Sequence, residues 1–189
     1  MDITDKLISI LQMVNDWLKF AEAKNAILLA FCGAGITVTV TYLSAATSIL
    51  NSLQVGLLIS LFFLSVSSLI CSLSFLPKTD IEHFVWLRTK PTRKSKTRLS
   101  DDDNFYFFNC IKKYEPEYLL DAMNRLYFQS QVQIPYRKED LDIASQITIN
   151  SEIAAIKFTF FRVALWFLIF SILVLPVSLL GSLMIYHRL

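Results

Sequence analysis

The chain has 189 residues, of which 54% are hydrophobic and 18% are charged, and its formal net charge is +2. No charged residue lies between Lys24 and Lys78, and a second uncharged run covers residues 163–186. Because a helix needs roughly 20 apolar residues to cross a bilayer, these runs hold two spans and one span, which excludes a soluble enzyme of ordinary size.

Residues 1–24 are predicted to form an amphipathic helix. Asp2 and Thr4 can cap its start, and six apolar residues recur at helical spacing. These residues are Ile3, Leu7, Ile10, Leu11, Val14 and Leu18. Neither Gly nor Pro separates this segment from the first uncharged run, so the helix is expected to continue into the membrane.

The two uncharged runs predict three transmembrane helices. The first run is expected to divide where Ser, Thr and Asn gather, at residues 44–52. This division leaves one transmembrane helix at residues 25–43 and another at residues 54–76. The second run predicts a transmembrane helix at residues 161–186.

Small residues and helix breakers suggest where the spans pack or bend. Gly33 and Gly35 belong to a group of small residues in the first span, which permits close approach of another helix and is a predicted self-association surface. Three spans cannot enclose a pore alone, so a pore would require such association. Pro176 and Gly181 are candidate kinks in the third span, although contacts with neighbouring helices often let such residues remain in a spanning helix.

The segment between the second and third spans, residues 77–160, is predicted to be helical and cytoplasmic. Helices are expected over residues 79–90, from residue 104 behind a cap at Asp101 to Asp103, from Pro116, and from Lys138. The last of these is expected to pass unbroken into the third span, and only residues 131–136 alternate as a strand would. The predicted fold class is an all-α membrane protein with three transmembrane helices.

The positions of the basic residues predict the orientation in the membrane. The region from Lys78 to Arg162 holds 14 of the 18 Lys and Arg residues, whereas residues 44–53 hold none. Under the positive-inside rule, the N-terminus and the central segment lie in the cytoplasm, and the short turn and the C-terminus lie outside.

Charged clusters and metal-binding residue types give no specific site. Residues 88–98 carry six basic side chains, which could contact anionic lipid headgroups, capture a phosphate, or form a solvated linker that fixes topology. The acidic residues 101–103 could hold a divalent metal, but helix capping explains them at once. The three Cys and two His lack ligand spacing, and all four Gly lie inside apolar runs, which excludes a Gly-rich phosphate loop. No metal, cofactor or nucleic-acid partner is predicted.

Several polar residues lie beside the predicted spans. Gln146, Asn150 and Lys157 share one stripe of the last helix, and apolar neighbours suggest that this stripe faces protein. Glu22 and Asn25 share a face of the first helix. A Glu22–Lys157 pair could bridge the two helices, because ionisable groups at membrane depth tend to be paired and functional. The alternative is that both side chains snorkel to the interface.

Catalytic constellations are missing from the sequence. His83 and His187 lie far apart, and neither belongs to a recognisable Ser/His/Asp or Cys/His set. The sequence therefore predicts a protein that is not an enzyme.

Three stretches carry a family resemblance: WLKFAEAKNAILLAF (17–31), NFYFFNCIKKYEPEYLLDAM (104–123) and DLDIASQITINSEIAAIKFTFFRVAL (140–165). Together with the membrane layout, they resemble the Pycsar effector domain, the transmembrane-effector family called PycTM. The resemblance covers nearly the whole chain, and its strength lies in three motifs in the family's order.

The resemblance implies a bacterial antiphage effector in the inner membrane, paired with a cyclase that makes cyclic UMP or cyclic CMP after infection. The nucleotide would be the activating ligand of a homo-oligomer that impairs membrane integrity and stops growth. Trp17 and Phe107 are among the positions that match the family. Nine further matching positions are the candidates for ligand binding or signal coupling: Glu22, Lys24, Asn25, Asn104, Phe108, Tyr118, Gln146, Asn150 and Lys157.

Two other functions fit the same layout. A non-lytic scaffold would recruit a protein partner through the cytoplasmic helices, and a small channel subunit would respond to another control. For the effector, one or two cations and an aromatic side chain such as Phe105, Tyr106 or Tyr118 would suit a ligand that has one negative charge and a flat base.

Overall fold

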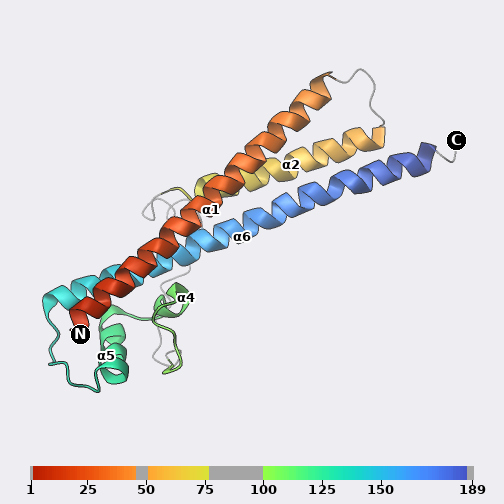
Figure 1. Cartoon of the computed structure of the whole chain (residues 1–189). Helices are drawn as coiled ribbons and strands as arrows, with labels where there is room; N and C mark the ends of the chain where they lie inside the picture. Colours follow the sequence, from red (N-terminus) through yellow and green to blue (C-terminus); the bar gives the residue numbers. More distant parts are fainter. Residues whose placement is uncertain (1, 46–50, 77–99, 187–189) are drawn as a thin grey trace. The chain divides into compact units, whose positions relative to one another are not determined.

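The computed structural model describes residues 2–45, 51–76 and 100–186, and the described residues contain helices and no strand (Figure 1). The helices are α1 (Ile3–Ala45), α2 (Asn51–Leu73), α4 (Phe108–Ile111), α5 (Pro116–Tyr127) and α6 (Lys138–Tyr186). Three of them, α1, α2 and α6, are long and apolar enough to cross a membrane. The predicted all-α membrane fold with three spans is confirmed.

Two of the spanning helices are much longer than a bilayer requires. Helix α1 has 43 residues and α6 has 49, whereas α2 has 23. The prediction that the first and last helices continue without a break is therefore confirmed. Helix α6 also passes through Pro176 and Gly181 without ending.

The start of α1 is capped by acidic side chains. The Asp2 carboxylate accepts the backbone N–H of Ile3 at 2.7 Å, and the Asp5 carboxylate accepts that of Asp2 at 3.2 Å. Asp2 therefore has the predicted capping role, because it satisfies a backbone donor at the helix start. Thr4 instead donates its hydroxyl hydrogen bond to Asp140, at 2.7 Å.

The chain forms two compact units, each built from segments that are distant in sequence. The polar unit contains residues 1–21 and 77–158, and the span unit contains residues 22–76 and 159–189. Helices α1 and α6 each contribute residues to both units. The predicted helix at residues 79–90 and the basic run 88–98 lie outside the described residues.

The polar unit has its own hydrophobic core. The first turns of α1 pack there against the 105–114 segment, α5 and the beginning of α6. The fully buried side chains include Leu7, Ile10, Tyr114, Leu120 and Ile147. Pro116 occupies the first turn of α5, as predicted, where its missing N–H costs no helical hydrogen bond.

One predicted helix start in the polar unit is wrong. The helix expected from residue 104 is the single turn α4, which begins at Phe108, and no side chain caps its start. The Asp103 carboxylate instead accepts hydrogen bonds from the Lys113 ammonium group at 2.6 Å and from the Tyr114 hydroxyl at 2.9 Å. The acidic residues 101–103 therefore do not cap α4, and Asp103 instead holds the loop before it through hydrogen bonds.

The span unit packs through small and apolar side chains. Leu28, Cys32, Leu64, Cys71, Ala164 and Leu168 form its buried hydrophobic cluster. A Cβ atom on Gly35 would lie 3.1 Å from Leu64 Cδ1, whereas one on Gly33 would meet nothing within 4 Å. Gly35 therefore serves packing within the unit, and of the two glycines only Gly33 keeps an open face for self-association.

Candidate functional site

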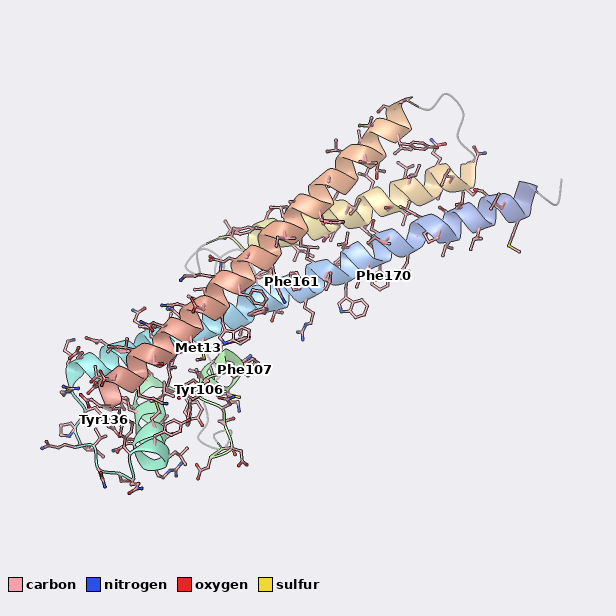
Figure 2. All side chains as sticks on the ribbon, in the orientation of Figure 1. Met13, Tyr106, Phe107, Tyr136, Phe161 and Phe170 are labelled. Atoms are coloured by element: carbon pink, nitrogen blue, oxygen red, sulfur yellow. The ribbon has the colours of Figure 1, made fainter. Side chains whose placement is uncertain are left out.

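Phe108 belongs to a cluster of aromatic rings in the polar unit. Its ring stacks on Phe158, with 5.0 Å between centroids and an interplanar angle of 12°, and its centroid lies 5.7 Å from that of Trp17. Phe107, labelled in Figure 2, lies 4.9 Å from Phe108. Phe108 is only 7% exposed, so the structure gives this candidate a packing role between α1, α4 and α6.

Asn104 and Tyr118 also have local structural roles. The Asn104 side-chain carbonyl accepts the backbone N–H of Tyr106 at 2.8 Å, which forms a tight turn before α4. Tyr118 is half-buried and packs against the core of the polar unit. Asn104 itself remains exposed.

The three candidates on α6 differ in environment. Gln146 is exposed, Asn150 is half-buried, and Lys157 is buried at 8% exposure. The Asn150 side-chain amide donates to Asn15 on α1 at 2.8 Å. The prediction that the whole stripe faces protein is therefore wrong at Gln146, because Ile147 takes the core position beside it.

The remaining candidates lie in the span unit, at the beginning of the first span. Lys24 places its ammonium group 5.3 Å from the ring centroid of Phe161, which is labelled in Figure 2. Asn25 is fully buried and Glu22 is half-buried. Glu22 and Lys157 belong to different units, so the predicted pair between them stays a prediction.

The structure adds a cationic site that the sequence reasoning missed. The Lys6 ammonium group donates to the Tyr106 hydroxyl, and it lies 4.7 Å from the Tyr106 ring centroid and 5.3 Å from that of Tyr127. Tyr127 is 44% exposed, so this Lys6–tyrosine cluster reaches the surface. Burial, and then the neighbouring Tyr106, raise the pKa of Tyr127, while Lys6 opposes that rise.

A second network joins the beginnings of α1 and α6. The Asp140 carboxylate is 1% exposed and accepts hydrogen bonds from Thr4 at 2.7 Å and from Arg137 at 3.1 Å. Arg137 also donates to Thr4 and, at 3.3 Å, to Asp2. Four polar groups thus hydrogen-bond to one another, so the network holds the beginnings of α1 and α6 together.

Neither of two hollows in the described part of the chain suits an anionic ligand. In the polar unit a hollow of about 290 Å³ is lined by Met13, Asp16, Trp17 and Phe20. Its one charged side chain is a carboxylate, which repels a phosphate. A hollow of about 370 Å³ in the span unit is lined almost entirely by apolar side chains. Among the described residues no cluster of His, Cys, Asp and Glu could hold a metal ion.

The sequence profile of the Pycsar effector protein domain, PycTM, matches residues 6–184, almost the full length described above. This chain belongs to the Pycsar effector family. The family resemblance seen in the sequence is confirmed. Neither a curated protein nor a solved structure matches the chain.

Membership in the family defines the class of protein. The chain is a multi-pass membrane protein with a role as an effector of Pycsar antiphage defence, and its family is one of membrane effectors and not of catalysts. The family also implies a cyclic nucleotide signal made by a partner cyclase. In this Pycsar effector, the Lys6–tyrosine cluster is the described arrangement that offers a cation beside an aromatic ring close to the surface of the polar unit.

Proposed function

We propose that the chain is an effector of the bacterial inner membrane that a cyclic pyrimidine mononucleotide, cyclic UMP or cyclic CMP, activates. The nucleotide binds the polar unit, the chain self-associates, and the assembly impairs membrane integrity and arrests growth. The C-terminus lies on the outer side of the inner membrane, and the polar unit lies in the cytoplasm, where the cyclase product accumulates.

The observation that carries this proposal is the continuity of α1 and α6. Both helices supply core residues to the polar unit and then continue as two of the three spans. A ligand that favours one packing of the polar unit therefore acts on helices that reach the bilayer. The ligand can shift the populations of two arrangements of the spans only as far as its affinities for the corresponding packings of the polar unit differ.

The Lys6–tyrosine cluster supports the ligand class. A cyclic mononucleotide needs a cation for its phosphate and an aromatic face for its base. Of the aromatic side chains expected to take the base, Phe105 is 1% exposed and Tyr118 is packed on the core. Tyr106 lies beside Lys6, and Tyr127 presents a second ring to the same cation.

Membrane depolarisation in cells tests the function. Cells expressing the chain are supplied with cyclic UMP or cyclic CMP by a co-expressed cyclase, and a voltage-sensitive dye reports the membrane potential. We expect depolarisation with one of the two nucleotides and none with a catalytically inactive cyclase. If neither nucleotide depolarises cells in which membrane insertion is verified, the effector mechanism fails and the scaffold interpretation replaces it.

Substitution of Lys6 tests the ligand site within the same assay. Lys6→Gln removes the cation while retaining a polar side chain, so the nucleotide response should fall by roughly tenfold or more, as expected for loss of a charge-assisted contact. Lys19→Gln is the matched control, because Lys19 lies on the same helix and its side chain is 77% exposed. An equal response in the two variants would remove the Lys6–tyrosine cluster from the ligand site.

A further inference from the structure

Two groups of hydroxyl side chains in the span unit differ in where their hydrogen bonds go, and Ser182 alone makes both kinds of bond among the residues named below. In one set, exposed hydroxyls donate to the carbonyl four residues earlier in their own helix. This outer set contains Thr37, Ser44, Ser65 and Ser72, with donor–acceptor distances of 2.9–3.0 Å. Such bonds survive in lipid because each hydroxyl carries its partner with it.

The second set lies between α2 and α6, and its hydrogen bonds cross from one helix to the other. The Ser60 and Ser171 hydroxyl oxygens share a hydrogen bond at 2.7 Å, and Ser67 donates to the Ala164 carbonyl at 2.8 Å. Ser52 and Ser182 share a further hydrogen bond. We call this set the hydroxyl seam.

The hydroxyl seam is buried except at Ser52, which is half-buried. Ser60, Ser67, Ser171 and Ser182 are each at most 3% exposed. The outer surface of the unit carries large apolar side chains, among them Val38, Phe62, Leu69, Val177 and Leu180, which are each at least 60% exposed. In this structure the unit therefore presents hydrocarbon outward and keeps its interhelical hydroxyls inside, which suits a protein that does not leak.

We propose that the hydroxyl seam is the closed form of the polar lining of the membrane lesion. When the activated chains associate, α2 and α6 part, and the seam faces water between the chains. This inference rests on the proposed function, since it assigns residues to the lesion that the function requires.

The requirements of a permeation path support this assignment. A path for ions through hydrocarbon needs side chains that bond water along most of its length. Seam residues on α2 extend from Ser52 to Ser67, which at 1.5 Å per residue is roughly 22 Å of a hydrocarbon core of about 30 Å. Parting the helices removes the partner across each interhelical contact, and water can then hydrogen-bond the freed hydroxyls together with the carbonyls of their own helix, as the Ser178 carbonyl already does for Ser182.

Cysteine accessibility tests the assignment on the full chain. Ser60→Cys and Ser65→Cys are compared in a background where Cys32, Cys71 and Cys110 are replaced by Ala, and labelling by a charged, water-soluble thiol reagent is measured with and without the active cyclase. The two positions are matched, since both are serines on α2, but Ser60 belongs to the seam and Ser65 to the outer set. The membrane potential is recorded in the same cells.

The expected result is that nucleotide raises the labelling rate of Ser60→Cys by about tenfold or more, because a thiolate reacts only where water reaches it. Labelling of Ser65→Cys should remain at its resting level. Depolarisation without labelling at Ser60, or with labelling at Ser65 alone, would overturn the hydroxyl seam as the lining. Absence of depolarisation in the parent chain identifies a failure of the proposed function itself.

A reversible cross-link provides a second readout. The Ser60→Cys, Ser171→Cys double variant places two thiols where the native hydroxyls touch, so oxidation should join α2 to α6. Oxidised cells should retain their membrane potential in the presence of nucleotide, and a reductant should restore depolarisation. Undiminished depolarisation with a verified cross-link would show that the lesion forms without opening the seam.

Discussion

At the scale of single residues, the positions that match the family divide into packing and surface roles. Phe108 packs its ring against aromatic neighbours, whereas Asn104 shapes a turn and Gln146 remains at the surface. Lys6 was not among the sequence candidates, although its ammonium group lies within 5.3 Å of two tyrosine ring centroids. Its partner Tyr106 lies 100 residues away in sequence, so no local pattern could reveal the pair.

The Asp103 carboxylate provides a pH-dependent prediction. Burial alone would raise its pKa, but hydrogen bonds from Lys113 and Tyr114 outweigh burial and hold the pKa below its ordinary value. Burial, and then the bond to Asp103, raise the pKa of Tyr114, so this phenol remains a donor at neutral pH. A carboxyl group with a lowered pKa stabilises the fold above its unfolded-state pKa of about 3.9, and that contribution is lost as the pH falls.

Asp103→Asn should therefore lower the free energy of unfolding of the purified chain by about 2 kcal/mol at pH 7, the size of charged hydrogen bonds. The difference from the parent chain should shrink as the pH falls below about 4. Denaturant titration followed by tryptophan fluorescence measures both effects. Asp102→Asn is the control, because Asp102 is exposed and its side-chain hydrogen bond is 3.5 Å long. A difference that persists undiminished at pH 3 would refute the ion-pair explanation.

At the scale of helices, the sequence predicted the continuity of α1 and α6 and the starts of α5 and α6, but it did not predict the start of α4. The passage of α1 and α6 into the spans was predicted correctly because no Gly or Pro interrupts the chain where polarity gives way to hydrocarbon. The start of α4 was predicted wrongly because consecutive acidic residues favour a helix cap, and tertiary partners took Asp103 instead. Local sequence propensity predicts a helix start poorly where the residues concerned also make tertiary contacts, because those contacts override the propensity.

Gly56 is the glycine at which the pairing of α2 with α6 can be tested. A Cβ atom there would collide with the side chain of Ser178, whose position on a packed helix leaves it little room. Gly56→Ala should therefore separate the helices locally and lower the thermal unfolding midpoint in detergent by several degrees, as an overpacked contact does.

The control for this substitution is Gly33→Ala, because a Cβ atom there meets nothing within 4 Å. Since Ala favours helix over Gly, Gly33→Ala should leave the midpoint unchanged or raise it. Equal losses in the two variants would mean that the effect is a general intolerance of larger side chains and not a contact between α2 and α6.

At the scale of the whole chain, the polar unit constrains the topology. Residues 3–14 and 105–147 share one hydrophobic core, so the N-terminal segment and the central segment must lie on the same side of the membrane. The sequence predicted that both are cytoplasmic from their basic residues alone. It could not predict that they form a single core, because that pairing depends on contacts between distant segments.

Reporter fusions test the orientation. Alkaline phosphatase, which is active only outside the cytoplasm, should be active when fused after residue 189 and inactive when fused after residue 158. A fluorescent protein that matures only in the cytoplasm should give the opposite pattern, because the positive-inside rule places the basic central segment inside. Phosphatase activity at residue 158 would reverse the topology and would place the polar unit away from the cyclase product.

The polar unit is built from residues 1–21 and 77–158, so its core can form only after most of the chain has been synthesised. The hydrogen bond from Thr4 to Asp140 can form only after a further 136 residues have been translated. At 5–20 residues per second this takes roughly 7 to 27 s. Two spans are therefore made before the core of the polar unit can close. A chain whose translation stops early therefore has its first two spans but lacks the core of the polar unit.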